Sequence, residues 1–187
     1  MSSQTAVVAG SLSAMAQRNG MSLAESFLSC DLIVLIDQSA SMSQRDAPGG
    51  KSRFDAADAE LARIQRDNPG RVGVVAFSNH AVFCPGGVPI RLSGGTDMAE
   101  ALRFIHVADN TGIKLILISD GEPDSEDKAL AQVRRFKSPI HTLYIGSENG
   151  RGRVFLEKLA NATGGKAFKT TAPGLLANTV ETLLLKG

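Results

Sequence analysis

Three oxygen-bearing side chains follow the first apolar run of the chain at alternate positions. Asp37, Ser39 and Ser41 come directly after residues 32–36, whose sequence Leu-Ile-Val-Leu-Ile predicts a buried strand. Alternate side chains of an extended segment point the same way, so the three oxygens can converge on one point. Because hard divalent cations bind oxygen ligands, the spacing indicates a metal site where this strand leaves the sheet.

Two later segments carry further oxygen side chains. A second strand pattern, residues 114–119, runs into Asp120, and a glycine-rich loop, residues 93–97, carries Thr96. In open parallel sheets, ligands bind outside the carboxyl ends of the strands, which is where Asp37 and Asp120 are expected. The candidate ligands of one shared site are Asp37, Ser39, Ser41, Thr96 and Asp120.

Strand and helix patterns alternate along the chain. Strands are expected at 32–36, 71–77, 81–84, 114–120, 140–146 and 166–169, and helices at 53–66, 97–106, 125–136, 154–162 and 174–185. This rhythm predicts an α/β fold with a Rossmann-like, mostly parallel central sheet and helices on both faces. The short strand at 81–84 ends in Pro85-Gly86-Gly87, which predicts an antiparallel edge strand.

The first thirty residues predict two short helices. Apolar residues between Ala6 and Ala16 recur at helical spacing, Gly20 divides the segment, and Ser22 with Glu25 forms a capping-box signature. Two interpretations of these helices are open. They either pack on the domain's own sheet or dock a partner or a second copy of the chain.

The composition limits the function classes. With 187 residues, of which 43% are hydrophobic, the chain is long enough for one domain with a sizeable core. A net charge of +1, one Tyr and no Trp argue against a nucleic-acid surface. There is no signal-peptide pattern and no apolar run approaching ~18 residues, so we expect a cytoplasmic protein without membrane contact. Cys30 and Cys84 are expected as reduced thiols.

With its five oxygen side chains in this order, the chain resembles a von Willebrand factor A (VWA) domain. The resemblance covers most of the chain from about Asp31 and includes residues 155–165, which are similar to the family's last helix and turn. It rests chiefly on the family's metal-ion-dependent adhesion site (MIDAS), which pairs Asp-x-Ser-x-Ser with a later Thr and a later Asp. We therefore expect an N-terminal helical extension at 1–30 and a VWA domain at 31–187.

The resemblance implies a protein-interaction module rather than an enzyme. Ser39, Ser41 and Thr96 would supply neutral ligands to Mg²⁺, while Asp37 and Asp120 would supply charge directly or through water. Mn²⁺ and Ca²⁺ also take oxygen ligands. If the aspartates act mainly through water, the ion's charge stays incompletely neutralised, and an Asp or Glu of a partner protein can occupy an open position. Bacterial members of the family often work beside AAA+ ATPases, which the resemblance allows as a partner; the sequence leaves the partner and the oligomeric state open.

Two other functions compete with this one. A metal-dependent phosphohydrolase is the less favoured, because its Asp nucleophile usually has a second Asp two residues later, where this chain has Ser39. The other is a structural subunit that uses the fold without metal. Thr96 has a simpler possible role as the N-cap of the next helix. Asp97 with Glu100 also forms a capping signature, which would free Thr96 for the metal.

Two segments beside the site have no assigned role. Residues 42–52 form a loop longer than is typical of the family, which either shapes partner choice or is a tolerated surface insertion. Residues 121–127 bring further carboxylates close to the site, where they weaken the attraction of an acidic ligand or cap a helix. The three histidines, His80, His106 and His141, lie far apart and show no zinc spacing.

Overall fold

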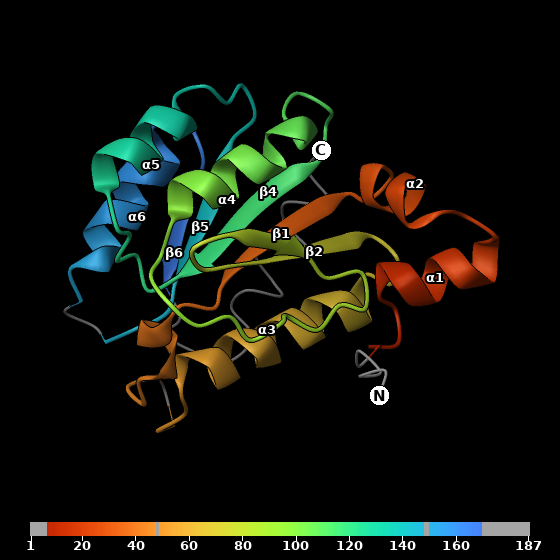
Figure 1. The fold of residues 1–187 in the computed structure, drawn as a ribbon, viewed down its shortest axis with the longest axis horizontal. Helices are drawn as coiled ribbons and strands as arrows, with labels where there is room; N and C mark the ends of the chain where they lie inside the picture. The colour runs from red at the N-terminus through yellow and green to blue at the C-terminus, as the bar shows by residue number, and fades with distance from the viewer. Residues whose placement is uncertain (1–6, 48, 148–149, 170–187) are drawn as a thin grey trace.

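A six-stranded sheet forms the centre of the computed structural model (Figure 1), which describes residues 7–47, 49–147 and 150–169. The strand order is β3-β2-β1-β4-β5-β6, and every neighbouring pair is parallel except β2 with β3. The strands are β1 (Leu32–Asp37), β2 (Val72–Phe77), β3 (Ala81–Phe83), β4 (Lys114–Ser119), β5 (Ile140–Tyr144) and β6 (Ala167–Lys169). The predicted α/β fold with one antiparallel edge strand is confirmed.

Helices cover both faces of the sheet. The α-helices are α1 (Leu12–Asn19), α2 (Leu23–Leu28), α3 (Arg53–Asp67), α4 (Met98–Ile105), α5 (Glu126–Val133) and α6 (Gly152–Asn161), and the 3₁₀ helices are η1 (Ala40–Ser43) and η2 (His106–Ala108). α3 lies on one face, and α4, α5 and α6 lie on the other (Figure 1). None of the helices in the described ranges has the length and apolarity to span a bilayer. The helix expected at 174–185 lies outside the described residues.

The central strand β1 is buried on both faces, with every residue 1% exposed or less. Leu32, Val34 and Ile36 pack in one apolar cluster with α3. Ile33 and Leu35 pack in a second cluster with α4, α5 and α6. Because both faces of the strand need apolar side chains, its sequence is a continuous apolar run rather than an alternating one.

Three element ends differ from their predicted positions by two residues or more. α5 stops at Val133 instead of Phe136, and the N–H of Phe136 bonds the carbonyl of Val133, which tightens the last turn. The ring of Phe136 then packs on His106, with ring centroids 4.9 Å apart. β5 ends early, at Tyr144, and α6 begins early, at Gly152.

The N-terminal helices pack against the rest of the fold. The predicted capping box is present, since Ser22 and Glu25 each accept a bond from the other's backbone N–H. In α1, Leu12 is 2% exposed. In α2, the ring of Phe27 lies edge-on to Phe83 of β3, with centroids 4.6 Å apart. Packing on the domain's own sheet is therefore confirmed, while the division of the chain at residue 30 stays a prediction.

Removing the buried side chain of Leu12 is expected to destabilise the whole protein. Leu12→Ala should lower the free energy of unfolding by about 2–4 kcal/mol, because it leaves a cavity in a core cluster. Leu23→Ala is the control, since Leu23 is 44% exposed, and should cost less than about 1 kcal/mol. Urea unfolding followed by circular dichroism measures both. Equal small effects would show that α1 is not part of the cooperative unit.

Candidate functional site

The predicted site lies at the carboxyl edge of the two central parallel strands. Ile36 of β1 pairs with Ile118 of β4, so Asp37 and Asp120, which follow shortly after, emerge at the same edge of the sheet. Asp37 is fully buried, and Asp120 is 1% exposed. The structure therefore brings together two carboxylates that lie far apart in the sequence.

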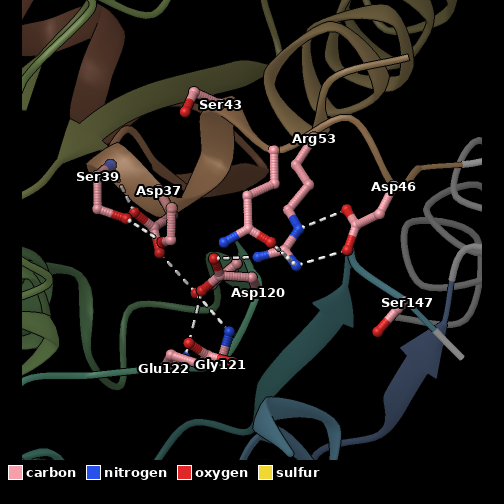
Figure 2. Close-up of polar contacts among 12 residues, drawn as sticks. Asp37, Ser39, Ser43, Asp46, Arg53, Asp120, Gly121, Glu122 and Ser147 are labelled. Carbon is pink, nitrogen blue, oxygen red and sulfur yellow. Dashed lines mark hydrogen bonds and ion pairs between the residues drawn. The ribbon is translucent and has the colours of Figure 1, made fainter. Parts of the chain in front are cut away.

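Both oxygens of Asp37 accept hydrogen bonds (Figure 2). Oδ1 accepts the backbone N–H of Ser39 at 2.8 Å, and Oδ2 accepts the hydroxyl of Ser119 at 2.7 Å. The oxygen of the same hydroxyl accepts the N–H of Gly121 at 2.9 Å. Ser119 thus ties Asp37 to the turn after β4. The sequence prediction omitted Ser119, whose only signal is a hydroxyl at the last position of an otherwise apolar strand.

The three predicted hydroxyl ligands lie on two loops that are joined to each other. Ser39 and Ser41 lie at the start of η1, and their hydroxyl oxygens are 3.1 Å apart. Thr96 is 4% exposed and lies in the loop before α4. The N–H of Ala40 donates to the carbonyl of Gly94 at 3.2 Å. This bond joins the loop of the two serines to the loop of Thr96.

Thr96 is held through its backbone. Its N–H donates to Oδ1 of Asp124 at 2.9 Å, and its carbonyl accepts the N–H of Asp124 at 3.0 Å. The next helix is capped by Asp97, whose carboxylate accepts the N–H of Glu100 at 2.9 Å. The prediction that Asp97 caps α4 in place of Thr96 is confirmed. Of the carboxylates at 121–127, Asp124 supports the Thr96 loop.

Close backbone contact holds the turn after β4 against α6. Gly121 has φ 72°, in the left-handed region. A Cβ on Gly121 would overlap the carbonyl of Gly152, and a Cβ on Gly152 would overlap the carbonyl of Asp120. Both positions therefore require glycine, and Asp120 is presented from a backbone that is fixed on two sides.

Two buried carboxylates lie close together at this edge. Burial, together with the charge of Asp120, raises the pKa of Asp37 to about 6, although hydrogen bonds from Ser39 and Ser119 act to lower it. An ionised carboxylate in the interior is costly unless hydrogen bonds or a cation compensate its charge. A cation bound here would offset that cost.

An arginine that the sequence prediction omitted contacts the site. Nη1 of Arg53 donates to Oδ2 of Asp120 at 2.7 Å. The other guanidinium contacts are to Asp46, at 2.8 and 2.7 Å, and to the side chain of Gln44, at 2.9 Å. The hydrogen bond to Asp46 and the charges of both carboxylates raise the pKa of Arg53, so its positive charge is permanent. In the sequence, Arg53 is only the polar first residue of an amphipathic helix.

The donor set fits a hard divalent cation. It consists of carboxylate and hydroxyl oxygens, which are the ligands that Mg²⁺ prefers, and it carries buried negative charge. Within the described ranges, no group of three or more His, Cys, Asp or Glu side chains could hold a metal, so the candidate site depends on its hydroxyls. The residues that would hold the ion are Asp37, Ser39, Ser41, Thr96 and Asp120.

Solved structures from several organisms share this arrangement of strands and helices. An aerotolerance-related membrane protein from Bacteroides fragilis, crystallised with multiple mutations to serines, matches with a TM-score of 0.66 and 15% identity over 84% of this chain and 100% of that one. A von Willebrand factor type A structure from Catenulispora acidiphila matches with a TM-score of 0.59 and 18% identity, over 84% of this chain and 42% of that one. The chain has a VWA-like fold.

A further structure with a similar fold is BatB from Bacteroides thetaiotaomicron. It matches with a TM-score of 0.60 and 14% identity over 84% of this chain and 100% of that one. No protein-family model and no curated protein matches the sequence. At these identities, the similarity shows the VWA-like fold alone and assigns no role to the site.

The raised pKa of Asp37 predicts a pH-dependent stability of EDTA-treated protein. The folded state binds this proton more tightly than the unfolded state, so ionisation of Asp37 costs stability as the pH rises from about 4 to above 6. Asp37→Asn removes this cost. Its free energy of unfolding relative to the wild type should therefore rise by about 2–3 kcal/mol between pH ~4 and pH ~7. Urea titrations across this range measure the difference, and a constant difference would contradict the prediction.

Proposed function

We propose that this chain is a metal-dependent protein-interaction module. The five residues of the candidate site would hold a divalent cation, Mg²⁺ in the first instance, as a MIDAS does in VWA domains. The observation that carries the proposal is the buried pair of carboxylates, Asp37 and Asp120, at the carboxyl edge of a VWA-like sheet, beside loops that carry three hydroxyls.

An open position on the bound ion would take an acidic ligand. Two carboxylates would balance the two charges of the ion, the hydroxyls add none, and the charge of Arg53 beside Asp120 is offset by Asp46. A carboxylate from another protein would then bind as a further oxygen ligand of the cation. The expected ligand is an Asp or Glu side chain of a partner, and the resemblance to VWA domains makes an AAA+ ATPase one candidate.

The two alternative functions are a phosphohydrolase and a metal-independent structural subunit. No observation favours a phosphohydrolase, since the position of its second Asp is Ser39, whose hydroxyl lies 3.1 Å from that of Ser41. A metal-independent structural subunit has the same fold as the proposed module and differs only in the use of the site. Metal binding therefore decides between the metal-dependent module and the metal-independent structural subunit.

Mg²⁺ binding tests the site directly. Calorimetric titration of EDTA-treated wild-type protein is expected to show one Mg²⁺ site. The double variant Ser39→Ala/Ser41→Ala should not bind Mg²⁺, because it lacks two of the neutral ligands. Ser43→Ala is the matched control, because Ser43 lies in the same 3₁₀ helix, is exposed and bonds the carbonyl of Ala40 at 2.7 Å. Circular dichroism checks that every variant is folded. Equal binding by wild type and the double variant would refute this site.

Metal-dependent capture of a carboxylate tests the function. Labelled peptides that contain Glu, and matched peptides with Gln at the same position, are titrated with the protein and followed by fluorescence anisotropy. Only the Glu peptides should bind, and EDTA or Asp37→Ala should abolish their binding while the fold is retained. Binding that survives EDTA would favour the metal-independent subunit, and turnover of a phosphate ester would favour the hydrolase.

A further inference from the structure

Arg53 is held in place by the 42–52 loop as well as by the candidate site. Nε and Nη2 donate to Asp46, and Nη1 donates to Asp120. The backbone N–H of Arg53 also donates to the carbonyl of Gln44 at 3.0 Å, so Gln44 binds both its backbone and its side chain. The Arg53 side chain is 7% exposed. These contacts hold the guanidinium beside one oxygen of Asp120, as Figure 2 shows.

The contact between Arg53 and Asp120 is a buried ion pair. The Asp120 side chain is 1% exposed, and the two charged atoms are 2.7 Å apart. Asp37 interacts electrostatically with the same carboxylate. Solvent screens charges weakly in a buried site. The charge of Arg53, part of which Asp46 offsets, therefore acts on any ion that the two carboxylates bind.

We propose that Arg53 is a positioning residue that sets the metal affinity of the site through Asp120. Its Nη1 engages Oδ2 of Asp120, so Asp120 offers its other oxygen to a cation. That oxygen, Oδ1, accepts one long bond, 3.3 Å from the N–H of Glu122. The inference rests on the proposed function, since it concerns the same ion.

The charge of Arg53 also decides the direction of the effect. A fixed positive charge repels the incoming cation, so Mg²⁺ binds more weakly than two carboxylates without the arginine would bind it. The same charge leaves the loaded site more positive, which strengthens its attraction for the carboxylate of a partner. Arg53 therefore lowers the affinity of the site for Mg²⁺ and raises the affinity of the loaded site for a partner's carboxylate.

Mg²⁺ titration of charge variants tests this inference. Arg53→Met should bind Mg²⁺ at least about tenfold more tightly than wild type, because the positive charge of the guanidinium beside Asp120 is removed. Its thermal midpoint in EDTA should fall, because Asp120 then lacks its buried partner. Arg53→Lys keeps the charge and should bind Mg²⁺ within about threefold of wild type. Arg66→Met is the control on the same helix, since Arg66 is 70% exposed, and should change neither quantity.

The Mg²⁺ affinity of Arg53→Met separates this inference from the proposed function. Equal or weaker binding by folded Arg53→Met, with wild-type binding intact, overturns the role of Arg53 and leaves the metal site standing. Tighter binding by Arg53→Met and Arg53→Lys alike also overturns it, since lysine keeps the charge. If Arg53→Met does not fold, Arg53→Gln replaces it with the same expectation. Failure of wild type and every Arg53 variant to bind Mg²⁺ overturns both proposals.

Discussion

Two carboxylates, Asp37 and Asp120, are buried side by side at the ends of β1 and β4, and removing ionised groups from water costs several kcal/mol each. The surrounding structure supplies compensation from three directions. Ser39 and Ser119 donate to the two oxygens of Asp37, and Arg53 supplies a full positive charge to Asp120. The loop after β1, the end of β4 and the start of α3 thus each stabilise the pair of carboxylates.

The 42–52 loop takes part in this compensation. Its Gln44 and Asp46 contact the guanidinium of Arg53, and Arg53 in turn lowers the pKa of Asp46, chiefly through their hydrogen bond. These contacts tie Gln44 and Asp46 of the loop to the candidate site. A role of the loop in partner choice stays a prediction.

Local patterns in the sequence were enough to predict the sheet and the position of both carboxylates. Asp37 and Asp120 each end an apolar strand, and the ends of neighbouring parallel strands meet at one edge. The contact of Arg53 with Asp120 was not predictable in this way, because it joins two distant segments through a loop without periodicity. Ser119 was missed because a hydroxyl at a strand end has no distinctive spacing. The metal and the roles of the five ligands stay predictions.

The antiparallel strand β3 has a consequence for self-association. Unpaired backbone groups at a sheet edge are a template for the strand of another molecule. β3 is three residues long and is followed by Cys84 and Pro85. The N–H groups of Val8 and Ser13 bond the carbonyls of Gly86 and Pro85, both at 2.9 Å. The N-terminal segment thus pairs with the two residues that follow Cys84, which shortens the stretch of edge backbone that another strand could pair with.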